Sequence, residues 1–170
     1  YIDLVGMDLK ELAVKVTKAG INVEKVITNK IDHLTIGEVL ECVDHPDSDH
    51  LHVCKVDIGT DILNIVCGAP NVRAGIKVIV AQVGAELPGD FKIKKGMIRG
   101  QESNGMLCAL YEIGLDKKFL SEKDIEGIHE LDDNAPLGED PIKYMNLDDE
   151  VIDFELTSNR GDLLSILGMA

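Results

Sequence analysis

The stretch VDHPDSDHLHVCKV, residues 43–56, contains three histidines, three aspartates and a cysteine, all of which are metal-binding residue types. Alternate residues of an extended chain share a face, so His50, His52 and Cys54 would converge if this segment is a strand. Structural zinc, however, usually takes paired ligands from two separate elements, and the chain has no CxxC or HxxxH pair. The aspartates also lack the glycine and distal glutamate of a calcium loop. We therefore predict a turn that leads into a strand, and no metal site.

A second candidate is the basic segment FKIKKGMIRG, residues 91–100. The formal net charge of the chain is −14, which alone argues against nucleic acid. Residues 73–99, however, carry six basic and two acidic residues, a local charge of +4, whereas residues 112–155 carry fifteen acids and four lysines. If the basic segment is one strand, Lys92 and Lys94 share a face and Lys95 turns to the other. Such a row can follow a phosphate backbone; the alternative is that the lysines only solvate an exposed strand.

Three further polar residues complete the candidate site. Asn71 ends the turn GAPN and Arg73 lies in the loop after it, and both would add a polar rim. Ser103 lies between two glycines, and its hydroxyl would bond either the backbone of its own loop, which we favour, or a phosphate. Aromatic residues are scarce, so we expect recognition of RNA shape and backbone more than of base sequence. The candidate RNA-binding residues are Asn71, Arg73, Lys92, Lys94, Lys95, Arg99 and Ser103.

The sequence offers no catalytic constellation. It contains no GxxxxGK[ST] phosphate loop, no nucleophile elbow and no metalloprotease helix motif. The four cysteines form no CxxC pair and lie in apolar runs, which predicts buried, reduced thiols in a cytoplasmic protein. No apolar run approaches the ~18 residues of a membrane helix, and no signal peptide is evident. We expect that the sequence is part of a longer protein, because both of its ends look cut.

The pattern along the chain predicts a mainly β protein. Residues 8–20 form a helix pattern with Asp8 as N-cap and Glu11 three residues on, and residues 21–27 look extended. Five short apolar runs follow between Thr35 and Leu110, separated by turn signals, which is typical of a small barrel or sandwich. Residues 115–149 are acidic and predict loops and short turns. Residues 151–156 alternate like a strand, and a helix is expected to begin near Asp162.

Several blocks of this sequence resemble one known family. In order they are HPDSD, VCGAPNVRAG, GAELPG, KIKK and RGQESNGM, and together they span residues 45–115. They are similar to the tRNA-binding OB-fold module of the bacterial phenylalanyl-tRNA synthetase β subunit. The helical lead-in and the segment IDFELTSNRGDLLSILGMA are similar to the flanks of that module. The resemblance implies a five-stranded OB-fold barrel (residues 35–150) inserted in a small, incomplete α+β flanking domain (residues 1–34 and 151–170).

The resemblance also implies partners and chemistry. The expected partners are tRNA and the synthetase α subunit, in an α2β2 assembly, with neither membrane nor DNA involved. ATP and magnesium are implied for the whole enzyme and no cofactor for this chain, because in the family aminoacylation lies on the α subunit and editing lies further along β. We therefore expect no catalytic activity from these residues alone. Two alternatives stay open: a free-standing tRNA-binding OB-fold protein, and a structural or assembly module of the synthetase.

Overall fold

The computed structural model describes residues 6–165 and divides the chain into two compact units. One unit combines the two ends of the chain, up to Asn29 and from Asp148, and the other runs from Lys30 to Leu147. Most of the regular structure is strand, as the apolar pattern predicted. Within residues 6–165, no helix reaches the length and apolarity that crossing a membrane requires.

The first unit packs one helix against a two-stranded ribbon. Its elements are α1 (Leu9–Lys18), β1 (Asn22–Thr28), β12 (Glu150–Glu155) and the 3-10 turn η3 (Gly161–Leu164). The Asp8 carboxylate caps α1 by accepting the backbone N–H of Glu11 at 2.9 Å, as the sequence predicted. β1 and β12 pair antiparallel although more than a hundred residues separate them. Where a helix was expected near Asp162, the chain forms only the short turn η3, after which Ser165 is extended, and residues 166–170 lie outside the described residues.

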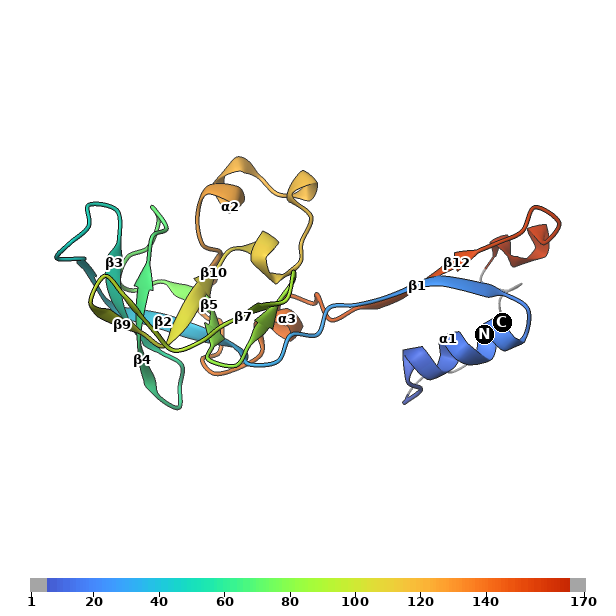
Figure 1. Ribbon diagram of the computed structural model, residues 1–170, viewed down its shortest axis with the longest axis horizontal. Coiled ribbons are helices and arrows are strands. Elements are labelled where there is room, and N and C mark those ends of the chain that lie inside the picture. Colours follow the sequence, from blue (N-terminus) through green and yellow to red (C-terminus); the bar gives the residue numbers. More distant parts are fainter. Residues whose placement is uncertain (1–5, 166–170) are drawn as a thin grey trace. The chain divides into compact units, whose positions relative to one another are not determined.

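The second unit is built on one curled antiparallel sheet, whose strands are coloured from light blue (β2) to yellow (β10) in Figure 1. The hydrogen-bonded order is β10-β5-β2-β3-β4, with a short strand β11 also pairing with β5. These are the five strands expected for an OB fold, and the fold class is confirmed. The strands are β2 (Leu34–Asp44), β3 (His52–Asp57), β4 (Ile62–Cys67), β5 (Lys77–Gln82), β10 (Gly105–Cys108) and β11 (Glu130–Leu131).

Strand β5 is buried on both faces. Val78 and Val80 lie in one apolar cluster with the side chains of β3 and β4, whereas Ile79 and Ala81 lie in a second cluster on the other face. This explains why KVIVAQ reads as a continuous apolar run. The second cluster is covered by the acidic part of the chain, which contributes Leu110, Ile113, Leu131, Ala135 and Ile142.

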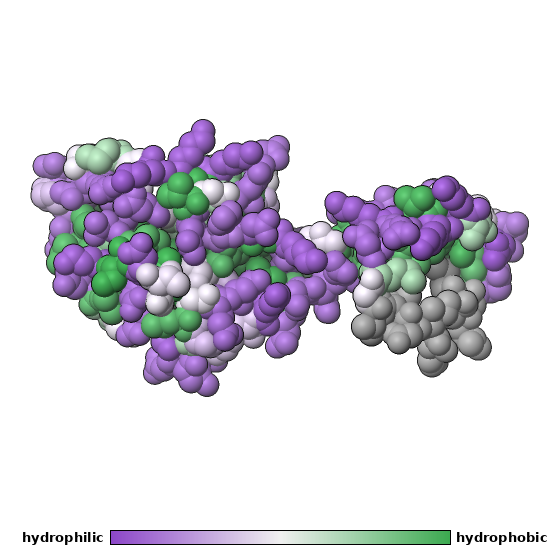
Figure 2. Space-filling model, turned by 90° about the horizontal axis from the view of Figure 1, so that it is seen from below, coloured by the Kyte–Doolittle hydropathy of each residue, from purple (hydrophilic) through white to green (hydrophobic). Residues whose placement is uncertain are grey.

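The acidic part contains only short elements, as predicted. They are the 3-10 turns η1 (Leu110–Ile113) and η2 (Lys117–Phe119) and the helices α2 (Glu122–Glu126) and α3 (Pro141–Tyr144). Leu110 and Ile113 of η1 and Ile142 of α3 belong to the apolar cluster on β5, whereas Phe119 of η2 is exposed. On the face shown in Figure 2, hydrophilic side chains dominate, with apolar residues in separate patches between them.

The barrel closes without a ladder between its two outer strands. β4 and β10 lie close together, yet they are not hydrogen-bonded partners in the sheet. Two bonds from the loop before β10 bridge them instead. The Asn104 N–H donates to the Asn64 carbonyl at 2.8 Å, and the Val66 N–H donates to the Ser103 hydroxyl at 3.1 Å.

Candidate nucleic-acid interface

The basic segment lies on and between two small hairpins, so the single strand considered from the sequence does not form. The first pairs β6 (Glu86–Leu87) with β7 (Phe91–Lys92), and the second pairs β8 (Gly96–Ile98) with β9 (Gln101–Ser103). One continuous strand is excluded because two tight turns fold the chain back on itself. In the second turn both central residues, Arg99 and Gly100, have positive φ (47° and 83°), as a two-residue hairpin loop requires.

Ile93 anchors the basic segment to the barrel. Its side chain is 6% exposed, its N–H donates to the Ala85 carbonyl at 2.8 Å, and its carbonyl accepts from Gly84 at 2.9 Å. Lys92 and Lys94 flank this anchor, and both are exposed. The buried isoleucine thus holds two lysines at the surface on either side of it.

Most of the lysines in this segment already have a carboxylate partner. Lys92 pairs with Glu86 at 3.2 Å, and Lys95 pairs with Glu102, which lowers the pKa of the Glu102 carboxyl. Lys94 has no ion pair within residues 6–165. Exposed ion pairs contribute only about 0–1 kcal/mol each, so a phosphate can compete for Lys92 and Lys95.

Arg99 and His45 join the second hairpin to the loop that follows β2. The Arg99 guanidinium donates to the Asp47 carbonyl at 2.8 Å. The His45 ring is 3% exposed; its Nδ1 accepts the Asp47 N–H at 3.0 Å, which leaves Nε2–H to donate to the Ile98 carbonyl at 3.2 Å. The sequence did not reveal this role of His45. Its signal was the HPDSD block, which we interpreted only as a turn.

The histidine-rich stretch forms no metal centre in the described part of the chain. Both ring nitrogens of His45 are engaged, and no group of three or more His, Cys, Asp or Glu side chains in residues 6–165 is arranged to hold an ion. His52 lies 3.3 Å from the Asp44 carboxylate across the β2–β3 ladder. Cys54 is fully buried, and its thiol lies 3.8 Å from the Cys42 sulfur.

The cysteines are free thiols, and three of the four are buried. Burial is the largest cause of the raised pKa of Cys54, Cys67 and Cys108, which reaches about 12 for Cys108. These thiols are therefore protonated near neutral pH and act as small apolar side chains. Cys42 departs from the prediction because it is only half-buried.

Asn71 and Arg73 belong to a different place from the basic segment. They precede β5 whereas the hairpins follow it, so this six-residue strand, roughly 20 Å long, runs between the two groups. Asn71 donates to the Ile128 carbonyl at 2.8 Å and accepts the Ile128 N–H at 3.0 Å. Arg73 forms two hydrogen bonds with Glu130, at 2.9 and 2.7 Å, and these are the main cause that lowers the Glu130 pKa to about 2.

Ser103 is 5% exposed and bonds within its own loop and barrel. Its hydroxyl donates to the Gly105 carbonyl at 3.2 Å and accepts the Val66 N–H at 3.1 Å. This is the turn-building role that the sequence favoured. The candidate residues therefore fall into three sets: Lys92, Lys94, Lys95 and Arg99 on or between the hairpins, Asn71 and Arg73 in the loop before β5, and Ser103 buried between β4 and β10.

Comparison with known proteins identifies the family. Residues 34–140 match a family described as "Putative tRNA binding domain", which is most of the chain. The chain belongs to this tRNA-binding domain family. The match covers the curled sheet, both hairpins and the acidic elements that precede α3. The resemblance inferred from the sequence is confirmed.

Relatives of this tRNA-binding domain carry it within a longer chain. The phenylalanine–tRNA ligase β subunit of Geobacillus kaustophilus is 49% identical over all of this chain, and that of Bacillus subtilis 47%. The β subunit of Pseudoalteromonas translucida is 50% identical over 97% of this chain. The chain spans about a fifth of the length of these relatives (22%, 22% and 20%). A methionyl-tRNA-synthetase-related protein of Pyrococcus horikoshii is a more distant likeness, with 21% identity and a TM-score of 0.43 over 62% of this chain and 84% of its own.

Proposed function

We propose that this chain is the accessory tRNA-binding part of a phenylalanine–tRNA ligase β subunit and that it binds the tRNA backbone through its basic segment. The observation that carries the proposal is that the Lys94 ammonium is exposed and has no ion pair in residues 6–165. Lys94 lies within the part of the chain that matches the tRNA-binding family. Arg99 and the loosely paired Lys92 lie on the same two hairpins, and the loosely paired Lys95 follows Lys94 in the link between them. Together they offer a short cationic ridge on an acidic protein.

The phosphate backbone is the best match for this ridge. Its groups are lysine and arginine side chains held on turns, which meet phosphates without reading bases. Each ion pair there is exposed, so a phosphate replaces a carboxylate with little loss. Asn71 and Arg73 stay candidates for a second contact with RNA. Their bonds to Ile128 and Glu130, however, already give both residues a structural role.

The relatives suggest the setting in which this binding is used. We infer a parent enzyme in the cytoplasm that attaches phenylalanine to tRNA with ATP and magnesium and contains an α subunit in an α2β2 assembly. No cofactor is assigned to the chain itself. Since the similarity to the β subunits extends over the flanks as well as the OB module, a free-standing tRNA-binding protein is not favoured.

A salt titration of tRNA binding tests the proposal. Affinity is expected to fall with salt concentration, with a log–log slope of about −0.7 to −0.9 for each phosphate that the protein contacts. The Lys94→Glu variant is expected to weaken binding several-fold at low salt and to reduce the magnitude of the slope by about 1. Fluorescence anisotropy with labelled tRNA at 50 and 200 mM salt measures both.

Lys10→Glu is the matched control. It makes the same charge change on an exposed residue of α1, in the other compact unit. Its affinity is expected to stay close to that of the unaltered chain. Equal losses in the two variants would mean that only net charge matters, and an absence of tRNA binding at low salt would favour a structural or assembly role instead.

The proposal also assigns no catalysis to these residues alone. ATP–pyrophosphate exchange by the isolated chain is expected to equal the background without protein. Exchange that depends on phenylalanine and on this chain would contradict that assignment.

A further inference from the structure

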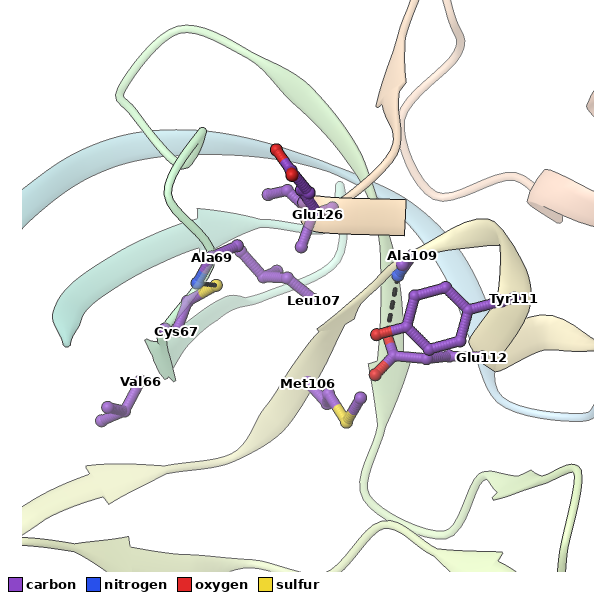
Figure 3. Close-up of a pocket in the computed structure, with 12 residues that line it drawn as sticks. Val66, Cys67, Ala69, Met106, Leu107, Ala109, Tyr111, Glu112 and Glu126 are labelled. Carbon is purple, nitrogen blue, oxygen red and sulfur yellow. Dashed lines mark hydrogen bonds between the residues drawn. The ribbon is translucent and has the colours of Figure 1, made fainter. Parts of the chain in front are cut away.

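A cavity of about 290 Å³ lies where β4 and β10 part, beside η1 and α2. Its walls include Cys67, Met106, Tyr111, Glu112 and Glu126, several of which are shown in Figure 3. A second cavity of about 360 Å³ shares Met106, Tyr111 and Glu112 and continues to Phe91. Since Phe91 begins the basic segment, the two cavities connect the cationic ridge to this opening in the barrel.

Two polar side chains of the cavity, Glu112 and Tyr111, can accept further hydrogen bonds. Glu112 Oε2 accepts the Ala109 N–H at 2.7 Å, while Oε1 accepts no hydrogen bond within the described residues. Tyr111 lines both cavities together with Glu112 (Figure 3), and its hydroxyl forms no hydrogen bond in the described chain. Glu112 is partly buried, and desolvation is the main cause of its raised pKa. An N–H donor from a ligand would replace the solvation that Glu112 lacks.

The surroundings favour part of a nucleic acid over a free amine. The Lys117 ammonium lies 4.1 Å from the centre of the Tyr111 ring and would repel a cationic ligand there. Tyr111 and Phe91 offer aromatic surface, which binds bases at about 1–3 kcal/mol per stacked base. The first cavity is at the lower end of the ~300–1,000 Å³ range of small-molecule sites, which suits one ring system.

We propose that this cavity holds one unpaired guanine of the bound RNA, with its N1–H and N2–H groups donating to the Glu112 carboxylate and its ring against Tyr111. This inference rests on the proposed function and names the base that the tRNA-binding surface selects. Guanine alone among the four bases presents two adjacent N–H donors on its Watson–Crick edge. In adenine and cytosine the amino group adjoins a ring-nitrogen acceptor, and in uracil the N–H is flanked by two carbonyl oxygens, which a carboxylate disfavours.

The charges also set the direction of the RNA strand. Glu126 lies on the rim of the cavity and is exposed, so it repels a phosphate on the α2 side. The backbone of the bound nucleotide therefore leaves toward Phe91 and Lys94.

Binding of two oligonucleotides to the full 170-residue chain tests the proposal. One is an eight-residue oligouridine and the other carries a single central guanosine, so the two have equal charge. At low salt the guanosine-containing strand is expected to bind about 10-fold more tightly, which is within the discrimination expected of one bidentate base contact. Equal affinity for the two strands would overturn the guanine site.

Two variants separate this base site from backbone binding. Glu112→Gln keeps an oxygen that accepts the Ala109 N–H but loses one acceptor, so the preference for guanosine is expected to disappear while binding of oligouridine is unchanged. Lys94→Glu is expected to weaken both strands by the same factor. A loss of affinity for both strands in Glu112→Gln would show a structural role and overturn the site. If neither strand nor tRNA binds the unaltered chain, the proposed function itself fails.

Discussion

Individual contacts decide which of the candidate residues are available to RNA. Ser103 is buried between β4 and β10, Asn71 is bonded to Ile128 and Glu130, and Lys94 alone among the lysines of residues 91–100 lacks a carboxylate partner in the described chain. The residue types were predictable from the sequence, but their partners were not. Lys95 meets Glu102 because the β8–β9 hairpin turns the chain back, and Arg73 meets Glu130 because the fold brings two distant segments together.

Replacing Ser103 by alanine tests its structural role. The change leaves the buried Val66 N–H without its acceptor, which is expected to lower the free energy of unfolding by about 1–3 kcal/mol. Urea denaturation followed by circular dichroism measures this. Ser103→Thr, which keeps the hydroxyl, is the control. Unchanged stability together with weaker tRNA binding would show that Ser103 contacts RNA instead.

Acid should weaken the ion pair between Arg73 and Glu130. The pKa of Glu130 is lowered to about 2 in the folded chain, against roughly 4.3 for an unfolded glutamate. A carboxyl group with a lowered pKa stabilises the fold above its unfolded pKa, and this contribution is lost as the pH falls toward its folded pKa. The difference in unfolding free energy between the unaltered chain and Glu130→Gln is therefore expected to be constant above about pH 5 and to shrink between about pH 4.3 and 2.

Urea denaturation of both proteins at a series of pH values measures that difference. The effect is expected to be small because the Arg73 side chain is 59% exposed. A difference that grows as the pH falls would contradict the assignment.

The length of a strand decides whether its sequence pattern reveals it. β2 to β5 and β10 are long enough for their apolar pattern to show, and the cap on α1 is local, so both were predicted. The hairpins around Lys94 were missed because strands of two or three residues show no period, and their register depends on turns and on Ile93 in the core. The cavity between β4 and β10 was not predicted either, because no local sequence pattern shows that two neighbouring strands lack hydrogen bonds to each other.

Replacing Gly37 in β2 by alanine tests how closely this sheet is packed. A Cβ atom on Gly37 would lie 2.7 Å from Val80 Cγ2 and 2.8 Å from Val56 Cγ1, so three strands meet closely there. Gly37→Ala is expected to reduce the free energy of unfolding by about 1–3 kcal/mol through overpacking. Gly96→Ala is the control, because no atom lies within 4 Å of its added Cβ. Equal effects of the two changes in thermal or urea denaturation would argue against this packing.

At the scale of the whole molecule, both apolar clusters lie inside the unit Lys30–Leu147. A shortened protein of residues 30–147 is therefore expected to unfold cooperatively and to bind tRNA with an affinity within about threefold of the full chain. Urea denaturation and anisotropy measure these two properties. If the shortened protein folds but loses tRNA binding, the unit formed by the two ends of the chain takes part in recognition.

The most direct test of the account is a map of hydrogen–deuterium exchange in the 170-residue chain with and without tRNA. Protection by tRNA is expected in residues 83–104, which hold both hairpins, and in residues 106–112 beside the cavity, and it should diminish at high salt. Protection that avoids residues 83–104 and falls instead on α1, β1 or β12 would contradict the claim that these hairpins bind RNA.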